Sequence, residues 1–168
     1  MNNSPLAYMQ RMRDYYLALG YNNPYQWAHF TEVPFQPLSQ GVAASTVALV
    51  TTAAPFKPEA GDQGPGAPYN AAAKFYRVYA GDASKDDFLG ISHVSYDREY
   101  SKAEDINSYF PLQALRQAQA QGRVGQVAPR YYGLPTNRSQ ATTQEQDCPD
   151  LLAMLQDDEV DLAILVAN

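Results

Sequence analysis

The sequence predicts an α/β domain with a mainly parallel sheet and helices on both of its faces, a Rossmann-like arrangement of three layers. Two uncharged runs of aliphatic residues, 46–51 and 162–167, have the length and composition of strands that are buried on both faces. Segments with the apolar spacing of helices lie between them, and alternating strands and helices are typical of parallel sheets. The last run is so apolar that we expect it beside the first, away from an exposed edge.

An N-terminal part, residues 1–41, precedes this α/β domain of residues 42–168. Ser4 and Pro5 suit the start of an amphipathic helix, and Gly20 suits its end. Residues 21–38 then carry three prolines among aromatic side chains, a composition that excludes both a helix and a central strand. We expect an extended aromatic arm that packs on a surface of this chain or of a partner.

Within the α/β domain, helical spacing recurs over residues 105–122, ending at Gly122, and over residues 149–155, starting at a proline. Residues 124–132 alternate loosely, as in an edge strand or hairpin, and turn-forming residues occupy positions 131–137. The proline- and glycine-rich loop 53–68 is either a surface loop or a mobile flap beside a site at the end of the first strand.

Composition narrows the classes of function. Twelve basic against eighteen acidic residues give 12 − 18 = −6, which disfavours a nucleic-acid or anionic-membrane partner. No apolar run approaches the ~18 residues that span a bilayer. The single cysteine, Cys148, excludes an intrachain disulfide and suits the cytoplasm. The two histidines are too far apart to indicate a metal site, and no glycine pattern indicates a dinucleotide or phosphate loop.

The densest polar group is Ser92-His93 followed by Tyr96-Asp97. His93 has the chemistry of a general acid or base that Asp97 orients, while the alternative is a histidine hydrogen-bonded at a sheet edge. Cys148 is a weaker candidate nucleophile, because a helix N-terminus lowers a thiol pKa but a cysteine there also serves as a cap. Ligands of parallel sheets bind beyond the carboxyl ends of the strands, so we expect the site near Asn168.

Four segments carry a resemblance to a known family. They are Val-Ala-Leu-Val-Thr-Thr-Ala-Ala-Pro at 47–55, Ile-Ser-His-Val-Ser-Tyr-Asp at 91–97, Ala-Glu-Asp-Ile-Asn-Ser-Tyr-Phe-Pro-Leu at 103–112 and Gly-Arg-Val-Gly at 122–125. In this order they resemble the selenoprotein B family, which contains subunits of glycine, sarcosine, betaine and D-proline reductases. The resemblance covers the chain from about Val42, and the aromatic arm is similar to a short proteobacterial-type branch.

The resemblance implies an oxidoreductase subunit that cleaves a C–N bond of a small amine or amino acid with a selenol or thiol. It implies other reductase subunits as partners, one of which carries a pyruvoyl group. His93 and Asp97 match the polar motif of the family and are the candidate catalytic residues. In the family the selenocysteine, or its cysteine replacement, follows a strand like 162–167.

Here the sequence ends at Asn168, so we expect an incomplete and inactive chain, cut at a UGA codon through which the reading frame continues. Such a domain exposes apolar sheet surface, and we expect it to form a homo-oligomer. The alternative is a non-catalytic α/β binding or interaction domain, and an ordinary stop codon after Asn168 would favour it.

Overall fold

The structure is a computed structural model of the chain, and it describes residues 7–22, 26–55, 77–87, 89–91, 104–135 and 139–167. The chain divides into two compact units, Met1–Phe35 and Gln36–Asn168, and each is described by itself. The boundary that the sequence predicts at residue 42 stays a prediction.

The first unit contains the helix α1 (Tyr8–Ala18), none of whose residues is buried. Its end at Gly20 is confirmed: Gly20 has a left-handed φ of 85°, and the Tyr21 N–H donates to the Tyr16 carbonyl at 3.2 Å. Only glycine adopts this conformation without steric cost, so it closes the helix. The predicted start at residues 4–5 lies outside the described residues.

The second unit is built from short strands and helices. Its strands are β1 (Thr46–Thr51), β2 (Ala54–Pro55), β3 (Tyr79–Asp82), β4 (Leu89–Gly90), β5 (Gln126–Val127), β6 (Arg130–Gly133) and β7 (Leu162–Val166). Its helical elements are η1 (Val42–Ala44), η4 (Ile106–Ser108), α2 (Leu112–Ala120), α3 (Gln140–Thr142), η5 (Thr143–Asp147) and α4 (Cys148–Asp157).

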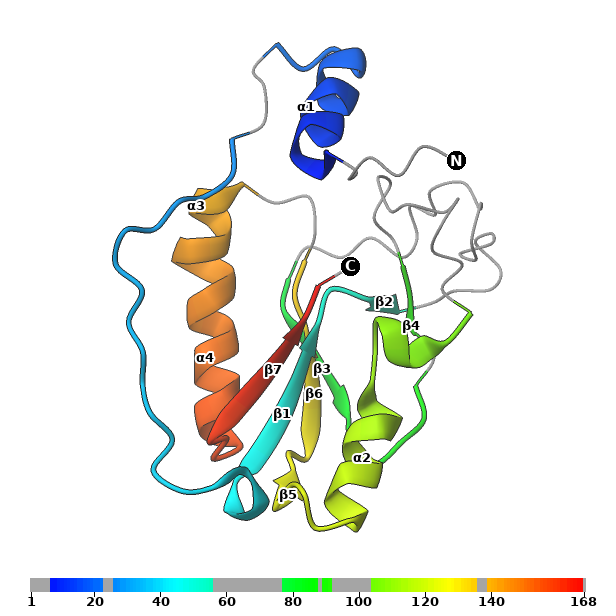
Figure 1. Cartoon of the computed structure of the whole chain (residues 1–168), viewed down its shortest axis with the longest axis vertical. Helices are drawn as coiled ribbons and strands as arrows, with labels where there is room; N and C mark the ends of the chain where they lie inside the picture. The colour runs from blue at the N-terminus through cyan, green and yellow to red at the C-terminus, as the bar shows by residue number, and fades with distance from the viewer. Residues whose placement is uncertain are drawn as a thin grey trace. The chain divides into compact units, whose positions relative to one another are not determined.

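The strand β1 organises the sheet. Along one edge it pairs in parallel with β7, from Val47 opposite Leu162 to Thr51 opposite Val166. Along the other edge it pairs in parallel with β5 near its start and with β6 near its end, and β3 is antiparallel to β6 (Figure 1). A mixed α/β domain is therefore confirmed, as is the prediction that the two aliphatic runs are parallel neighbours.

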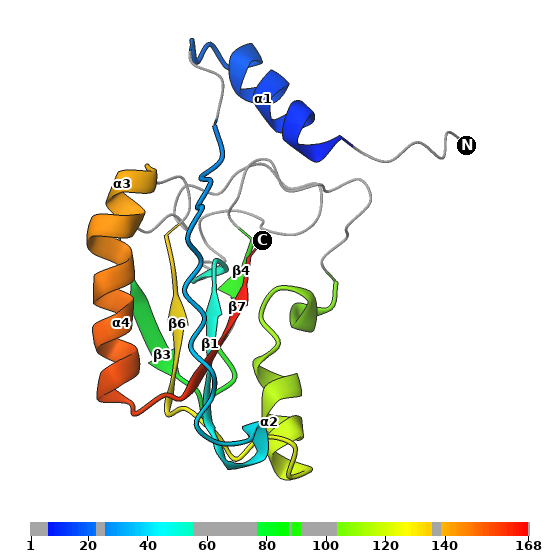
Figure 2. The same ribbon diagram turned by 60° about the vertical axis from the view of Figure 1, so that its left-hand side comes forward.

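The two faces of β1 are covered by different helices. Val47 and Leu49 belong to a core that includes α2, whereas Ala48 and Val50 belong to a core that includes α4 (Figure 2). This division follows from the alternation of side chains along a strand. All four side chains are at most 1% exposed, as the sequence predicts for a strand buried on both faces.

The prediction of complete burial is wrong for β7. In the described part of the chain its only paired neighbour is β1, and Leu165 is 71% and Ile164 39% exposed. Apolar composition reports that a strand is suited to burial, but not which of its edges and faces the rest of the chain covers. An aliphatic strand thus lies at an edge of the described sheet, where the sequence does not predict one.

The helix before β7 starts earlier than its proline predicts. Ser139 caps α3 by accepting a hydrogen bond from the Thr142 N–H at 3.1 Å, and α3, η5 and α4 follow one another without a break. Pro149 lacks an N–H and its ring would clash with a preceding carbonyl in a regular α-helix. The wider π-helical turn η5 ends two residues before Pro149, so the carbonyls that the ring would meet lie in this wider turn. No helix in the described residues is long and apolar enough to cross a membrane.

Candidate functional site

The end of β1 is fixed by a buried threonine. The Thr51 hydroxyl donates to the Tyr109 carbonyl at 2.8 Å and accepts from the Ala53 N–H at 3.0 Å. The Thr51 carbonyl accepts from the Leu134 N–H, just beyond β6, at 2.9 Å. One residue therefore ties the exit of β1 to the segment after η4 and to the segment after β6.

A tyrosine holds the next residue of the same turn. The Tyr79 hydroxyl, at the start of β3, donates to the Ala53 carbonyl at 2.7 Å. Burial raises the pKa of Tyr79, and the nearby Asp87 carboxylate raises it further. The hydroxyl consequently stays protonated and remains a donor at all physiological pH values.

A second tyrosine, Tyr131, packs edge-to-face against the ring of Tyr79. Tyr131 in β6 is 3% exposed, and its hydroxyl donates to Asp87 Oδ2 at 2.6 Å. Its ring meets Phe110 edge-on, with 4.7 Å between ring centroids, and Tyr79 at 6.3 Å. Burial and the bond to Asp87 raise the Tyr131 pKa.

These two tyrosines are fitted to glycines on the opposite strand. Tyr79 pairs with Gly133 and Gly81 pairs with Tyr131 in the antiparallel β3–β6 register. A Cβ atom on Gly133 would lie 1.9 Å from the Tyr79 ring, and one on Gly81 would lie 2.2 Å from the Tyr131 ring. Each ring therefore covers the backbone of the facing glycine. Strands β5 and β6 lie where the loose alternation of residues 124–132 predicts an edge strand or hairpin, whereas the turn expected over 131–137 is wrong for its first three residues, which belong to β6. The repeated Tyr-x-Gly pattern is the further signal for β3 and β6.

The chain continues from this frame into β2, which pairs with β4, so that Ala54 lies opposite Gly90 and Pro55 opposite Leu89. Ile91, directly after β4, is 4% exposed. The candidate residues His93 and Asp97 follow, but they lie outside the described residues, as do Asn168 and most of the loop 53–68. Their catalytic role stays a prediction.

Two of the four family-like segments meet at this end of the sheet, and the strand that leads into a third lies beside them. The Thr51–Tyr109 hydrogen bond joins segment 47–55 to segment 103–112, and the β2–β4 pairing brings segment 47–55 beside the residues that lead into segment 91–97. The end of β7 is also here, because the Thr52 N–H donates to the Val166 carbonyl at 3.2 Å. The carboxyl ends of parallel strands are where such sheets bind ligands.

The fourth segment, 122–125, lies at the opposite end of β1. Gly122 ends α2 with a left-handed φ of 70°, as the sequence predicts. Gly125 donates its N–H to the Val42 carbonyl at 3.1 Å, and a Cβ there would lie 2.7 Å from the Ala44 backbone. Both glycines are thus explained by backbone geometry and need no role in chemistry.

Other polar groups add little chemistry at this end. Asn107 in η4 donates its side-chain N–H to Asp105 Oδ1 at 2.9 Å, and its buried Oδ1 has no partner, which leaves an acceptor open. Cys148, the other candidate, is exposed at the start of α4. Among the described residues, no group of three or more His, Cys, Asp or Glu side chains could hold a metal ion.

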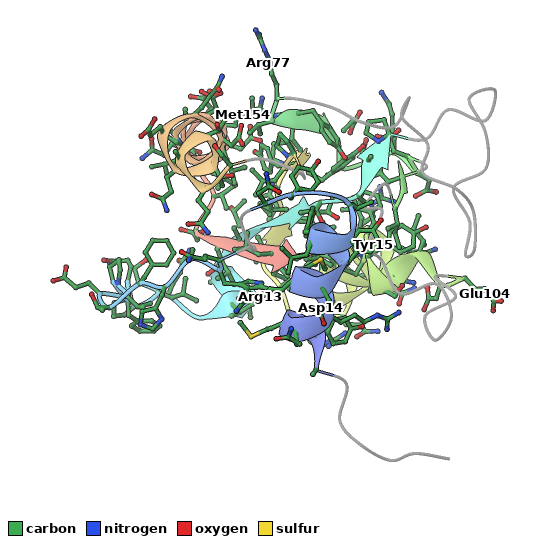
Figure 3. The ribbon with its side chains drawn as sticks, turned by 90° about the horizontal axis from the view of Figure 1, so that it is seen from above. Arg13, Asp14, Tyr15, Arg77, Glu104 and Met154 are labelled. Carbon is green, nitrogen blue, oxygen red and sulfur yellow. The ribbon has the colours of Figure 1, made fainter. Side chains whose placement is uncertain are left out.

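An ion pair anchors α4 to the sheet at the far end of β6. Arg130 donates to both oxygens of Asp158, at 2.8 and 2.9 Å, and the Tyr132 hydroxyl donates to the same carboxylate. Arg130 and the Tyr132 hydroxyl also reach the carbonyl of Met154, a residue of α4 labelled in Figure 3. The bond to Arg130 lowers the Asp158 pKa more than burial raises it. This cluster has the geometry of a structural clamp.

Fold and site together define a mixed α/β domain in which the segments 47–55 and 103–112 meet at the carboxyl end of the central strand. Residues 17–168 match the family model described as Glycine/sarcosine/betaine reductase selenoprotein B (GRDB), so the chain belongs to that family. No solved structure gives a significant match.

Two curated relatives are similar over most of this chain. The D-proline reductase subunit gamma of Acetoanaerobium sticklandii is 32% identical over 134 residues, which are 79% of this chain and 52% of the relative. The Glycine reductase complex component B subunit gamma of Carboxydothermus hydrogenoformans is 25% identical over 139 residues, 83% of this chain and 32% of the relative. The chain thus spans about half the length of the first relative and a third of the second.

Proposed function

We propose that this chain is a component of a reductase complex that cleaves a C–N bond of glycine, sarcosine, betaine or D-proline type substrates. The family match over residues 17–168 carries the proposal, and the names of the two relatives specify subunits of such reductases. The contact between segments 47–55 and 103–112 at the end of β1, with β4 paired beside them, supports a site at that place.

In this proposal a selenol or thiol supplies two electrons. The C–N bond breaks, a C–H bond forms at the carbon, the nitrogen takes up a proton, and the selenol and a thiol lose their two protons and two electrons as they join in a selenium–sulfur bond. A pyruvoyl group on a partner subunit would supply an electrophilic carbonyl that activates the substrate amine. His93 and Asp97 serve as the acid–base pair beside the reacting bond, while Thr51, Tyr79 and Tyr131 hold the framework in place.

The proposal includes a finer architecture and setting. The complete sheet is mainly parallel, with helices on both faces in a Rossmann-like arrangement, and the complex is cytoplasmic. The parallel pairing of β1 with β5, β6 and β7 supports this architecture, and antiparallel β3 is the exception to it.

The test deletes the gene in its own host and restores it as wild type, His93→Ala or His29→Ala. Extracts with a dithiol reductant are assayed for cleavage of glycine, sarcosine, betaine and D-proline by mass spectrometry. Deletion should abolish cleavage of one substrate, and His93→Ala should restore it with a rate ~10²–10⁴-fold lower, the usual contribution of a general acid or base. His29, an exposed histidine of the arm, is the matched control and should restore full activity.

Unchanged cleavage of all four substrates after deletion would contradict the proposal. The same experiment distinguishes the alternative function, a non-catalytic interaction domain. If the deletion abolishes cleavage, His93→Ala restores it fully and the other subunits fail to co-purify without this chain, the chain is a non-catalytic interaction domain of the complex.

A further inference from the structure

The outer edge of β7 is a strand edge that no described strand pairs with. The Val166 carbonyl points toward β1, since it accepts from the Thr52 N–H. Backbone groups alternate in direction along a strand, so those of Ile164 point toward β1 as well and those of Ala163 and Leu165 point outward. The edge therefore presents two donors and two acceptors in a regular row.

This edge has none of the devices that keep natural strand edges apart. The run Leu-Ala-Ile-Leu-Val contains no charged residue, no proline and no glycine. Leu165 on the α4 face and Ile164 on the α2 face are exposed. An exposed apolar edge of this kind favours pairing with another strand unless it is covered.

We propose that a second copy of this chain covers the edge by antiparallel pairing of β7 with the partner's β7. The two-fold axis passes between Ile164 and the partner's Ile164. In this register Leu162 lies opposite the partner's Val166, and the large exposed Leu165 lies opposite the partner's small Ala163. The strand is thus complementary to its own reverse in size and in apolar character.

The backbone directions fit the same register. Ala163 exchanges two hydrogen bonds with the partner's Leu165, and the two-fold axis repeats them, giving four in all. Ile164, whose own backbone groups point to β1, forms the non-hydrogen-bonded pair at the axis, where Cα atoms of opposite strands are about 4.5 Å apart. A register shifted by one residue would place inward-pointing backbone groups opposite outward-pointing ones.

Charge selects the antiparallel direction. Acidic residues gather at the amino end of β7, namely Asp157, Asp158, Glu159 and Asp161. Antiparallel pairing places the two clusters at opposite ends of the joined strands, separated by roughly 17 Å for a five-residue strand. That exceeds the screening length of about 8 Å at physiological ionic strength. A parallel pair would bring the clusters side by side.

The first measurement is the molar mass of the full chain by light scattering and sedimentation velocity over a wide concentration range. Wild type should be a dimer at high micromolar concentration, and Leu165→Lys should be a monomer throughout. Leu152→Lys is the matched control, because Leu152 is an exposed leucine (55%) on α4, and it should dimerise like wild type. Wild type that is monomeric throughout, or Leu165→Lys that dimerises like wild type, would overturn the proposal.

The second measurement tests the register without depending on affinity. In a Cys148→Ser background, Ile164→Cys places two thiols at the axis, where the Cα separation allows a disulfide. Mild oxidation should give a covalent dimer within minutes for Ile164→Cys and not for Leu152→Cys. Equal cross-linking of the two variants would overturn the register. Neither result depends on reductase activity, so the proposed function stands or fails separately.

Discussion

The two edges of β1 are covered in contrasting ways. On the side of β5, β6 and β3, side-chain contacts join the elements to one another. Tyr–Gly pairs and the Tyr131–Asp87 hydrogen bond hold β6 to β3 and to the segment after it, and the Arg130–Asp158 ion pair holds β6 to the end of α4. On the side of β7, the backbone pairing with β1 is longer, over five residue pairs, yet Ile164 and Leu165 remain exposed. The backbone of β7 is thus fully paired with β1, whereas the side chains of β7 are only partly packed.

This difference separates two roles within one sheet. The β3–β6 side is stabilised by specific contacts between residues far apart in sequence, each of which constrains its neighbours. The β7 side is stabilised by hydrogen bonds to β1 and leaves its outer apolar surface for another strand. Substitutions should therefore be costly on the first side and mild, or even stabilising, near the second.

The largest effect should come from Gly133→Val. The new side chain would overlap the Tyr79 ring, which lies 1.9 Å from the Cβ position, and would force β3 away from β6. We expect a loss of about 3 kcal/mol in the free energy of unfolding, measured with urea. Gly41→Val is the control, because nothing lies within 4 Å of its Cβ position. Equal losses for both would show that the β3–β6 packing is loose.

Arg130→Met should have the next largest effect. It leaves the Asp158 carboxylate, whose side chain is 11% exposed, without its cation, whereas Arg130 itself is 37% exposed and partly screened by solvent. We expect a loss of about 2 kcal/mol at pH 7, measured by urea unfolding.

The ion pair also predicts how stability depends on pH. Asp158 has a lowered pKa in the folded chain, so its contribution is present above its usual value of 3.8 and is lost as the pH falls through the lowered pKa. Asp158→Asn should therefore flatten the fall in stability of wild type below about pH 4. If Asp158→Asn loses stability below about pH 4 as steeply as wild type, other carboxylates account for that loss.

Tyr131→Phe should cost about 1 kcal/mol, the net value of one hydrogen bond, here to Asp87. Because the folded-state pKa of Tyr131 is raised, its contribution is fully present below pH 10 and is lost as the pH rises further. Wild type should lose stability more steeply than the variant above pH 10. Tyrosinate absorbance at 295 nm should show a late-titrating group that is missing from Tyr131→Phe.

The smallest effect lies at the turn into β7. Glu159 has a left-handed φ of 51° at the end of α4, a conformation that is strained for any side chain. Glu159→Gly should raise the free energy of unfolding by about 0.5–1 kcal/mol in thermal and urea unfolding. Glu159→Gln removes the same charge but keeps a side chain at the left-handed position, so it is the control and should change stability by less than about 0.5 kcal/mol. An equal change in both would contradict the strain at Glu159.

Local chemistry accounts for what the sequence predicts well. The bounds of β1 and β7, and the helix ends at Gly20 and Gly122, depend on uncharged runs and on the conformational freedom of glycine. These properties belong to short stretches and can be recognised without a fold. The left-handed turn at Glu159 has no such marker, because the side chain is placed there by the fold and not by preference.

Contacts between distant residues account for what it does not predict. The fit of Tyr79 over Gly133 joins residues 133 − 79 = 54 positions apart, and the Tyr-x-Gly repeat marks the two strands without indicating that they pair. In the sequence Thr51 has the character of an ordinary strand residue, and nothing there indicates that its hydroxyl donates to the Tyr109 carbonyl. Of the candidate site, the sequence predicts the end of the sheet, and the roles of His93 and Asp97 stay predictions because both lie outside the described residues.

The central position of β1 has a consequence during synthesis. Its sheet partners β5, β6 and β7 all follow it in the chain, and β7 ends 166 − 51 = 115 residues after β1. At ribosomal rates of ~5–20 residues per second, β1 is made roughly 6–23 s before that partner is complete. Until β5 and β6 are complete, the latter 133 − 51 = 82 residues after β1, the aliphatic run lacks its sheet partners on one edge, and its β7 edge stays unpaired until residue 166 is made. A nascent chain stalled after β1 should therefore bind chaperones that recognise extended apolar segments, and release them once β7 has left the ribosome.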